Sequence, residues 1–410
     1  MTAPTCRACT APLTRSLVDL GLSPLSNSYV PPERARMGEM FLPLHALVCD
    51  ACHLVQLEAY AAPEAIFSDY AYFSSFSSSW LRHAEAYAAA MAARFHLGAH
   101  SRVVEVASND GYLLRYFARA GIPVLGVEPA ANVAEVALAR GVPTEIAFFG
   151  RDTAARLLAE GGAADLMAAN NVLAHVPDLH DFLGGFAILL AAEGVVTFEF
   201  PHLLRLLAEC QFDTIYHEHF SYLSLGTVTG LLRRHGLRAF DVEELPTHGG
   251  SLRVFACREG AAQAEAPAVA RVLAEERAAG LTEPRGYAGF AEQVARIKCD
   301  ALDFLIAERR AGRTVCGYGA AAKGNTFLNY CGIGPELVRT VADRNPAKQG
   351  TLLPGSRIPV LSPEAVLAMR PDVLLILPWN LTAEITAEMA AIRAWGGRFA
   401  TAIPRLRVID

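Results

Sequence analysis

Two pairs of closely spaced cysteines near the start of the chain constrain its fold more than any other feature. Cys6 and Cys9 form C-R-A-C, and after a gap of 39 residues Cys49 and Cys52 form C-D-A-C. Two intervening residues let a tight turn point both sulfurs at one ion, and four thiolates suit tetrahedral zinc. Because four thiolates leave no open coordination position, we expect a structural zinc that orders a segment too small to build its own core. A pair of redox-active dithiols is the alternative.

The other five cysteines are scattered, and we expect them to pack in the core. An odd total of nine, in a chain whose first residues lack the pattern of a secretory signal, argues against a disulfide framework. The longest apolar runs, such as residues 182–192 and 373–378, are too short to span a membrane. A net charge of −6 argues against a nucleic-acid surface spread over the fold. The sequence therefore predicts a soluble cytoplasmic enzyme without membrane or nucleic-acid partners.

Strands and helices alternate along the middle of the chain, which predicts an α/β fold with a parallel sheet. Ligands of such sheets bind beyond the carboxyl ends of the strands. Strands are expected at residues 102–106, 123–127, 164–169 and 195–200, with helices at 112–120 and near 179–190. The residues at the strand ends are the candidates for ligand binding, namely Glu105, Asn109, Gly111, Glu128 and Asn171.

The chemistry of these strand ends indicates which ligand the sheet binds. An acidic residue after the second strand, here Glu128, can accept both ribose hydroxyls of an adenosine. The first turn lacks G-x-G-x-x-G and carries Glu105 and Asp110, which would repel a pyrophosphate. S-adenosylmethionine carries a sulfonium and an ammonium but no phosphate, so the sequence favours it over NAD. Merely solvated acidic strand ends are the alternative.

A second α/β unit begins near residue 314. A strand at 314–317 opens into G-Y-G-A-A-A-K-G-N, whose lysine is Lys323, and further strands are expected at 338–342 and 373–377. A glycine-rich turn, a helix N-terminus and a lysine together predict a phosphate site, with simple helix packing as the alternative. One unit is thus acidic at its first turn and the other basic, which fits a cationic methyl donor and a phosphorylated acceptor.

Four ionisable side chains follow one another within T-I-Y-H-E-H-F-S-Y, residues 214–222. Adjacent ligands diverge on any regular element and the H-E-x-x-H spacing is absent, so acid–base chemistry is favoured over a catalytic metal. An unperturbed histidine titrates near ~6.5 and can exchange a proton at physiological pH. Glu218 can orient a histidine or bond a substrate hydroxyl, and Tyr216 can donate to a developing enolate oxygen. We expect a structural role for one of His217 and His219, but not for both.

Three other segments contain further candidates. His175 stands in N-N-V-L-A-H-V, and His248 stands before two glycines that we expect to determine its backbone conformation. Residues 68–79, S-D-Y-A-Y-F-S-S-F-S-S-S, are expected to form a loop and a helix cap, although tyrosines of this kind can also line a site.

With these motifs, the chain resembles the S-adenosylmethionine-dependent sugar C-methyltransferases, which act on nucleotide-linked 4-keto deoxysugars of antibiotic pathways. The Y-H-E-H-F-S-Y motif and the lysine-containing glycine loop contribute most to the resemblance. The family implies an N-terminal zinc-binding module at residues 1–67, a central Rossmann-like methyltransferase domain at 68–250 and a second, C-terminal Rossmann-like domain at 251–410. The matching motifs appear in order over nearly the whole chain: the paired cysteines, Y-A-Y-F-S-S-F-S-S-S-W, E-V-A-S-N-D-G-Y-L-L, G-V-E-P-A-A-N-V-A, N-N-V-L-A-H-V-P-D, T-I-Y-H-E-H-F-S-Y-L-S, T-H-G-G-S-L-R-V and C-G-Y-G-A-A-A-K-G-N-T-F-L-N-Y.

The resemblance also implies roles for individual residues. The four N-terminal cysteines bind structural zinc, and the C-terminal domain binds the nucleotide diphosphate. His219 is the base that removes a proton next to the C4 ketone, and the resulting enolate is methylated at C3 or C5. S-adenosylmethionine is held by the turn from Glu105 through Asn109 to Gly111 and by Glu128, Pro129 and Asn171. The acceptor is contacted by Tyr216, Glu218, Tyr70 or Tyr72, His175, Tyr222, Lys323 and Asn325.

Three other functions are open at the level of the sequence. The C-terminal Gly-x-Gly unit can bind NAD in a nucleotide-sugar oxidoreductase. An O-methyltransferase needs a hydroxyl acceptor and no enolisable ketone. A zinc-dependent binding module with a degenerate site is the third, and the intact Y-H-E-H cluster argues against it.

Overall fold

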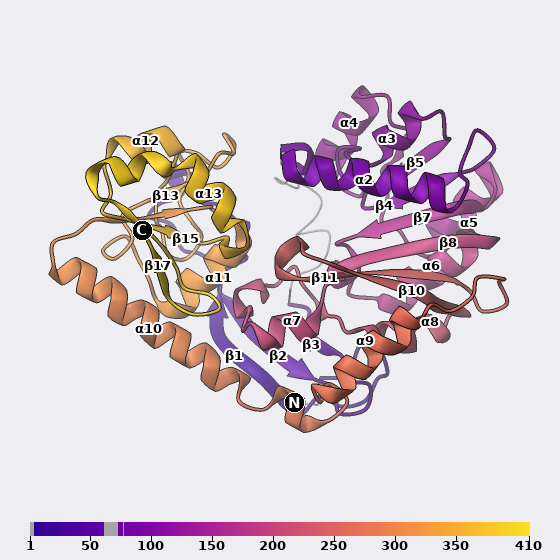
Figure 1. The fold of residues 1–410 in the computed structure, drawn as a ribbon, viewed down its shortest axis with the longest axis horizontal. Coiled ribbons are helices and arrows are strands. Elements are labelled where there is room, and N and C mark those ends of the chain that lie inside the picture. Colours follow the sequence, from indigo (N-terminus) through magenta and orange to yellow (C-terminus); the bar gives the residue numbers. More distant parts are fainter. Residues whose placement is uncertain (1–3, 61–72, 77) are drawn as a thin grey trace.

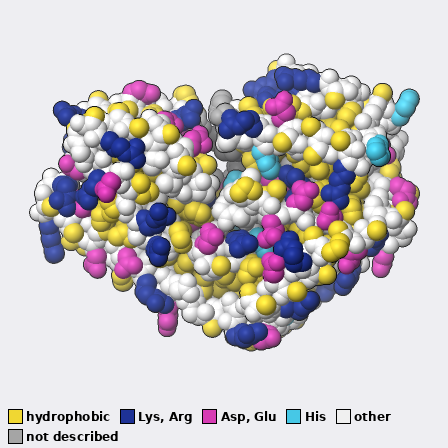
Figure 2. All heavy atoms as spheres, viewed as in Figure 1, with side chains coloured by type: hydrophobic (Ala, Val, Ile, Leu, Met, Phe, Trp, Pro, Cys, Tyr) yellow, Lys and Arg dark blue, Asp and Glu magenta, His cyan; other side chains and the backbone are white. Residues whose placement is uncertain are grey.

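The computed structural model describes residues 4–60, 73–76 and 78–410. Two α/β lobes lie side by side, and the N-terminal module runs beneath and between them (Figure 1). In the space-filling view the lobes are separated by a notch at the upper edge, and acidic and basic side chains are interspersed over this face (Figure 2). Among the described residues, no helix is long and apolar enough to cross a membrane.

The N-terminal module is built on a four-stranded antiparallel sheet with the order β1-β2-β3-β9. Its first three strands come from the module itself, and the fourth is contributed by the segment just after Y-H-E-H. Val55 pairs with Tyr222 and Gln56 with Ser221, so this distant segment is part of the module's sheet. The strands are β1 (Arg15–Ser23), β2 (Leu42–Val48), β3 (Val55–Leu57) and β9 (Ser221–Tyr222).

The central lobe contains a seven-stranded sheet with the order β10-β11-β8-β7-β4-β5-β6. Five strands are parallel, and β11 runs antiparallel to both β8 and β10. All four residues of β4 are buried, as expected for a strand covered by helices on both faces. The strands are β4 (Val103–Val106), β5 (Val124–Val127), β6 (Thr144–Glu145), β7 (Ala164–Asn170), β8 (Leu190–Pro201), β10 (Leu237–Leu245) and β11 (Ser251–Arg258).

Helices cover this sheet, and the alternation predicted from the sequence is confirmed. The predicted boundary between residues 250 and 251 falls inside the sheet, because β11 pairs with β8 and β10. The helices are α2 (Ser78–Arg94), α3 (Leu114–Arg119), α4 (Ala131–Ala139), α5 (Arg151–Gly161), α6 (Leu179–Leu189), α7 (Leu203–Ala208) and α8 (Leu225–Arg233).

The C-terminal lobe has a six-stranded sheet with the order β14-β13-β12-β15-β16-β17, parallel except for β17 at its edge. Helices α9 (Pro267–Ala278) and α10 (Phe290–Arg310) connect it to the central lobe along the underside (Figure 1). The strands are β12 (Val315–Tyr318), β13 (Val341–Ala342), β14 (Val360–Leu361), β15 (Val373–Ile376), β16 (Arg398–Thr401) and β17 (Arg407–Ile409), and the remaining helices are α11 (Ala322–Cys331), α12 (Pro363–Ala368) and α13 (Thr382–Glu388).

Apolar cores tie the module to both lobes. One core combines buried residues of β1 and β2 with α10, α11 and the C-terminal sheet. A second joins the cysteine turns and Leu54 to the central sheet and α6. Burying a large aliphatic side chain contributes roughly 1.5–3 kcal/mol. The shared cores therefore hold all three parts in one arrangement, which is needed for any site that they build together.

Candidate functional site

A cavity of about 570 Å³ opens at the carboxyl edge of the central sheet and extends to the C-terminal domain. All three parts of the chain line it. The central domain contributes the ends of β4, β5 and β7 together with the Y-H-E-H segment. The other two parts contribute Asn27, Tyr29, Ala321, Ala322, Lys323 and Lys348. Its volume is in the range of pockets that bury small organic ligands.

The end of the cavity at β5 carries the acidic group that was predicted to bind an adenosine. The two carboxylate oxygens of Glu128 accept the backbone N–H groups of Asn109 and Ala130, each at 2.9 Å. A carboxylate oxygen has two lone pairs, so each still has one for a ligand hydroxyl. Burial raises the pKa of Glu128, and the two backbone donors offset part of that shift.

Asn171 lies at the neighbouring strand end and also lines the cavity. It follows β7 with a φ of 53°, which turns the chain sharply at the edge of the sheet. Its side-chain oxygen is buried and has no hydrogen-bond partner among the described residues. A buried acceptor of this kind is costly unless a ligand satisfies it, so it marks a place for a ligand donor.

Two residues predicted to bind the methyl donor, Glu105 and Gly111, are not among the described residues that line the cavity. Gly111 has a φ of +73°, and a Cβ there would lie 3.0 Å from Cγ2 of Val142. It therefore lets the turn pack closely. Glu105 is fully buried in β4. Burial raises its pKa well above the usual range, with Tyr112 as a partly offsetting polar neighbour and Glu128 as a further cause.

His219 of the Y-H-E-H segment has its two ring nitrogens in different environments. Nδ1 lies 2.8 Å from the carbonyl oxygen of Thr214, and Nε2 lies 2.8 Å from the hydroxyl of Tyr216. A carbonyl only accepts, so Nδ1 carries the proton and Nε2 accepts from the tyrosine. Burial lowers the pKa of His219 well below its usual value, and nearby His175 adds to the effect. The imidazole is thus neutral, with a basic electron pair on Nε2 that accepts the tyrosine proton.

The neighbouring histidines differ in placement. His217 is buried, and its Nε2 lies 3.1 Å from the carbonyl oxygen of Pro43 at β2, away from the cavity lining. This placement matches the expectation of a structural role for one histidine of the pair. His175 lines the cavity with its ring edge-on to His219 at a centroid distance of 4.6 Å. Burial lowers the pKa of His175 to about 4, although a hydrogen bond to the Glu218 backbone partly opposes this.

Glu218 lines the cavity with a carboxyl group that is almost wholly buried. Its Oε1 accepts a hydrogen bond from Nδ2 of Asn27 at 2.7 Å. Burial raises the pKa of Glu218 to about 7, and the bond from Asn27 opposes the shift. The side chain therefore changes charge near neutral pH and can accept from a hydroxyl when it is ionised.

The end of the cavity at the C-terminal domain is basic. Lys323 donates to Oδ1 of Asn380 at 2.9 Å, and its ammonium lies 4.9 Å from the ring centroid of Trp379. The ammonium of Lys348 lies 5.3 Å from the ring centroid of Tyr29. Burial lowers the pKa of both lysines, and a neighbouring aspartate offsets part of the shift at each. Two ammonium groups at one end of a cavity suit an anionic ligand.

The glycine-rich turn beside these lysines is used for packing. Gly319 has a φ of +92°, and a Cβ there would lie 2.4 Å from Cδ of Pro378. Asn325, predicted to contact the acceptor, is buried in α11 and donates to the carbonyl oxygen of Ser26 at 2.6 Å. It is not among the residues that line the cavity. Its contact instead holds the N-terminal module against the C-terminal domain.

The remaining predicted residues fall into three groups. Tyr222 is buried in β9, paired with Val55, and does not line the cavity within the described chain. Tyr70 and Tyr72 lie outside the described residues. The cavity does bring together Asn109, Glu128, Pro129, Asn171, His175, Tyr216, Glu218, His219 and Lys323.

Several lining residues were not suggested by the sequence. Asn27 and Tyr29 stand in the polar stretch S-N-S-Y of the zinc module, where no spacing or periodicity marks a site. Lys348 lies in a turn after β13, and Trp80 lies in the first turn of α2. Only the tertiary arrangement reveals these contributions. His248, which the sequence offered as a further candidate, has a left-handed φ of 55° and also lines the cavity.

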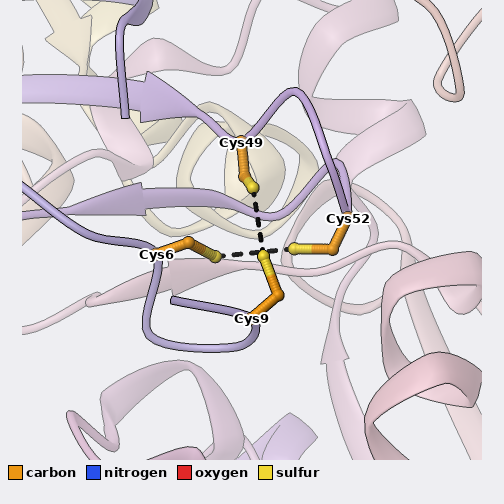
Figure 3. Close-up of side chains that lie close together, drawn as sticks. All are labelled: Cys6, Cys9, Cys49 and Cys52. Atoms are coloured by element: carbon orange, nitrogen blue, oxygen red, sulfur yellow. Dashed lines mark hydrogen bonds between the residues drawn. The ribbon is translucent and has the colours of Figure 1, made fainter. Parts of the chain in front are cut away.

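The four N-terminal cysteines converge on one point (Figure 3). Their sulfurs all lie within 4.8 Å of one another, with Cys6 3.5 Å from Cys52 and Cys9 3.4 Å from Cys49. A tetrahedral ion with Zn–S bonds of about 2.3 Å separates its sulfur ligands by roughly 3.8 Å. The set therefore fits zinc and leaves no position open for catalysis. Gln56 of β3 also donates to Sγ of Cys6 at 3.1 Å.

Three protein-family models match consecutive parts of the chain. They are described as "Putative zinc binding domain" over residues 6–67, "Methyltransferase domain" over 80–242 and "C-methyltransferase C-terminal domain" over 246–404. The C-methyltransferase NovU of Streptomyces niveus is 40% identical over 405 residues, which is 99% of this chain and 96% of that protein. The chain belongs to the C-methyltransferase family. It is thus an enzyme that uses S-adenosylmethionine and holds zinc in its N-terminal module.

Membership of this family decides between the functions that the sequence left open. A C-methyltransferase forms a bond to carbon, so the three alternative functions, namely the oxidoreductase, the O-methyltransferase and the binding module without activity, are excluded.

Solved methyltransferase structures also match the C-methyltransferase weakly. That of magnesium protoporphyrin IX methyltransferase (ChlM) from Synechocystis PCC 6803 with bound SAM covers 43% of this chain and 79% of its own, at 16% identity and a TM-score of 0.34. One from Mesorhizobium loti covers 42% and 98%, at 18% identity and a TM-score of 0.33. These likenesses are too low to bear on the site.

Proposed function

We propose that the enzyme methylates a carbon next to the C4 ketone, C3 or C5, of a nucleotide-diphosphate 4-keto-deoxysugar. The observation that carries the proposal is the charge pattern of a single cavity. Glu128 makes one end acidic, Lys323 and Lys348 make the other basic, and a neutral histidine with a basic nitrogen lines the same space. A cationic methyl donor suits the acidic end, and a diphosphate suits the basic end.

The residues at the acidic end fit S-adenosylmethionine. Glu128 keeps lone pairs for two ribose hydroxyls, and Asn171 offers its unpartnered oxygen to an ammonium group. Phe148 and Phe149 line the cavity near this end and form an apolar wall suited to a flat heterocycle. When bound, the cofactor supplies the electrophilic methyl group that a carbon nucleophile of the acceptor takes.

His219 is the base in the proposed reaction. The bond from Nδ1 to the Thr214 carbonyl fixes the ring and leaves Nε2 as the proton acceptor. Nε2 removes the proton next to the ketone, and the electron pair of the broken C–H bond passes toward the keto oxygen to give an enolate. A positioned base of this kind contributes roughly 10²–10⁴-fold to the rate. Because burial holds His219 neutral, the base is present without prior deprotonation.

Tyr216 has a second role in this scheme. Its hydroxyl donates to Nε2 in the free enzyme, so that proton must turn away before Nε2 can act. Rotation about the C–O bond lets the same proton be donated to the keto oxygen, where negative charge develops. One such donor is worth about 10²–10³ in kcat. The Tyr216 hydroxyl thus stays hydrogen-bonded to Nε2 of His219 until the keto oxygen of the acceptor takes its place as the partner of that hydroxyl.

The test uses a thymidine-diphosphate-linked 4-keto-6-deoxyhexose in D₂O, with S-adenosylhomocysteine in place of the methyl donor. The wild-type enzyme is expected to exchange deuterium into C3 or C5 and, when given the methyl donor, to add one methyl group there. His219→Asn keeps a donor toward the Thr214 carbonyl but lacks a base. It should lose exchange and methylation by at least about 100-fold while binding S-adenosylmethionine normally.

His217→Gln is the matched control, because it changes a histidine of the same segment that does not line the cavity. Its exchange rate should stay near that of the wild type. Normal turnover by His219→Asn would refute the assignment of the base. A wild-type enzyme that methylates none of a panel of nucleotide-linked 4-keto sugars would refute the acceptor class.

A further inference from the structure

One loop of the N-terminal module crosses to the C-terminal domain. This docking segment, residues 26–39, follows β1 and is held at both ends. The carbonyl of Ser26 accepts from Asn325, and Val30 forms an antiparallel bridge with Leu352. Glu39 pairs with Arg357 at 2.8 Å. These contacts fix the backbone of the docking segment on the C-terminal domain.

A side chain of the docking segment reaches the Y-H-E-H segment of the central domain. Nδ2 of Asn27 donates to Oε1 of Glu218 at 2.7 Å, across 191 positions of sequence. Both residues line the cavity. No hydrogen bond to Oε2 of Glu218 is found within the described residues, so this oxygen is left for a ligand. The backbone of Asn27 is fixed by the neighbouring Ser26, and its amide therefore has a defined direction.

The contact matters because a buried carboxylate is unstable without a donor. Removing an ionised carboxylate from water is costly unless hydrogen bonds replace its hydration. Burial raises the pKa of Glu218 to about 7, and Asn27 is the group that acts in the opposite direction. Without this amide, the carboxyl group would take up a proton more readily and would be free to rotate.

We propose that Asn27 is a positioning residue of the acceptor site: it holds Glu218 so that Oε2 of the carboxylate accepts a hydrogen bond from a hydroxyl of the acceptor. The inference rests on the proposed function, because it takes the acceptor to be a hydroxylated sugar. It gives the zinc-binding module a part in substrate recognition beyond the folding role that four thiolates imply. The module aligns Asn27 because its sheet contains β9, next to Glu218, while its docking segment is fixed on the opposite lobe.

The experiment compares Asn27→Leu with the wild-type enzyme on a thymidine-diphosphate-linked 4-keto-6-deoxyhexose that the wild type methylates. A hydrogen bond to a charged group contributes about 1.5–3 kcal/mol, which corresponds to roughly 10- to 100-fold in binding. The acceptor KM should rise by that factor, while kcat should stay within about threefold of the wild-type value. The hydrogen bond between Glu218 and the acceptor hydroxyl is present in both the ground state and the transition state, so its loss weakens binding rather than the chemical step. The Kd for S-adenosylmethionine should not change. Asn27→Gln keeps a donor and should recover part of the loss.

Two further variants distinguish positioning from mere structure. Glu39→Gln removes the ion pair with Arg357 at the far end of the docking segment but keeps the Ser26–Asn325 and Val30–Leu352 contacts on either side of Asn27, so it should leave the acceptor KM unchanged. When Glu218→Gln is already present, adding Asn27→Leu should raise the acceptor KM by less than about threefold. The two residues act through one contact, so the second change has little left to remove.

Each outcome bears on a different claim. A wild-type acceptor KM in Asn27→Leu, or an undiminished effect in the Glu218→Gln background, would overturn the role of Asn27. A Glu39→Gln variant that reproduces the KM defect would overturn it too, since general docking would then explain the result. Lack of methylation by the wild-type enzyme concerns the proposed function instead.

Discussion

The pH dependence of the reaction offers a sharp test of the site, because the structure assigns the titration to a residue that sequence reasoning would not choose. A Y-H-E-H motif suggests an acid limb from a histidine near pH 6.5. Burial, however, lowers the pKa of His219 well below that value and lowers the pKa of His175 to about 4. Both rings are therefore neutral throughout the usual assay range. Burial raises the pKa of Glu218 to about 7, so Glu218 is the group that changes charge.

The sign and size of the effect follow from that assignment. Glu218 accepts a stronger hydrogen bond from a hydroxyl when it is ionised than when it is protonated, so kcat/KM should rise with pH. With a pKa of about 7, the ionised fraction falls about tenfold between pH 8 and pH 6 and about tenfold more by pH 5. The charged or titratable groups that line the cavity with it are Tyr29, Tyr112, Glu128, His175, Asp178, Asp181, Tyr216, His219, His248, Lys323 and Lys348.

The assay measures kcat/KM for the acceptor from pH 5 to pH 9 in the wild type and in Glu218→Gln. The variant should be slower, and its limb near pH 7 should be absent. Burial raises the pKa of Asp213 to about 6, and this residue lies outside the described cavity lining. The variant Asp213→Asn therefore tests whether a limb near pH 6 arises from Asp213 rather than from Glu218. A limb near pH 7 that persists in Glu218→Gln would show that another group of the cavity causes it, and the assignment of the titration to Glu218 would fail.

Three other predictions address the remaining parts of the site. Glu128→Gln replaces one carboxylate oxygen, which accepts a backbone N–H, with an amide donor. The Kd for S-adenosylmethionine, measured by calorimetry, should therefore rise roughly 10- to 100-fold. An unchanged Kd would contradict the assignment of Glu128 to the ribose hydroxyls. Lys323→Ala and Lys348→Ala should each mainly weaken binding of the acceptor, more at low salt than at high salt, and an unchanged acceptor Kd would remove that lysine from the phosphate site. Cys49→Ala should lower the zinc content from one ion per chain and lower the Tm, as measured by elemental analysis and calorimetry, and full zinc retention would refute the four-cysteine site.

The strand ends and the four-cysteine site could be predicted, because each depends on a short stretch of sequence. Strand ends followed from the alternation of apolar runs and helices, and Glu128 and Asn171 stand on the cavity because parallel strands end at one edge. The four cysteines were recognisable from spacing because two residues between thiols fit one ion. In each case a short stretch of sequence contains the whole physical reason.

The sequence could not show what distant segments contribute together. Asn27 and Lys348 reach the cavity because their loops pack against other domains, and neither loop has a periodicity that records this. The two residues of β9 are too few to show alternation, and they pair with β3 only in the folded chain. Conversely, Glu105 and Gly111 match a binding motif, but Glu105 is buried in β4 and Gly111 permits close packing of the turn.

In both α/β units, an acidic side chain from the following strand end accepts a backbone N–H of the first turn. In the central domain Glu128 accepts the backbone N–H of Asn109, and in the C-terminal domain Asp343 accepts that of Ala320 at 2.8 Å. A glycine-rich turn binds phosphate through free backbone N–H groups, so an acidic side chain that occupies one of them weakens that mode. The glycine loop was predicted as a phosphate cradle, but its side chain Lys323 lines the cavity together with Lys348. Under the proposed function, the diphosphate would therefore be held mainly by two ammonium groups, which act as point charges and tolerate varied phosphate orientations.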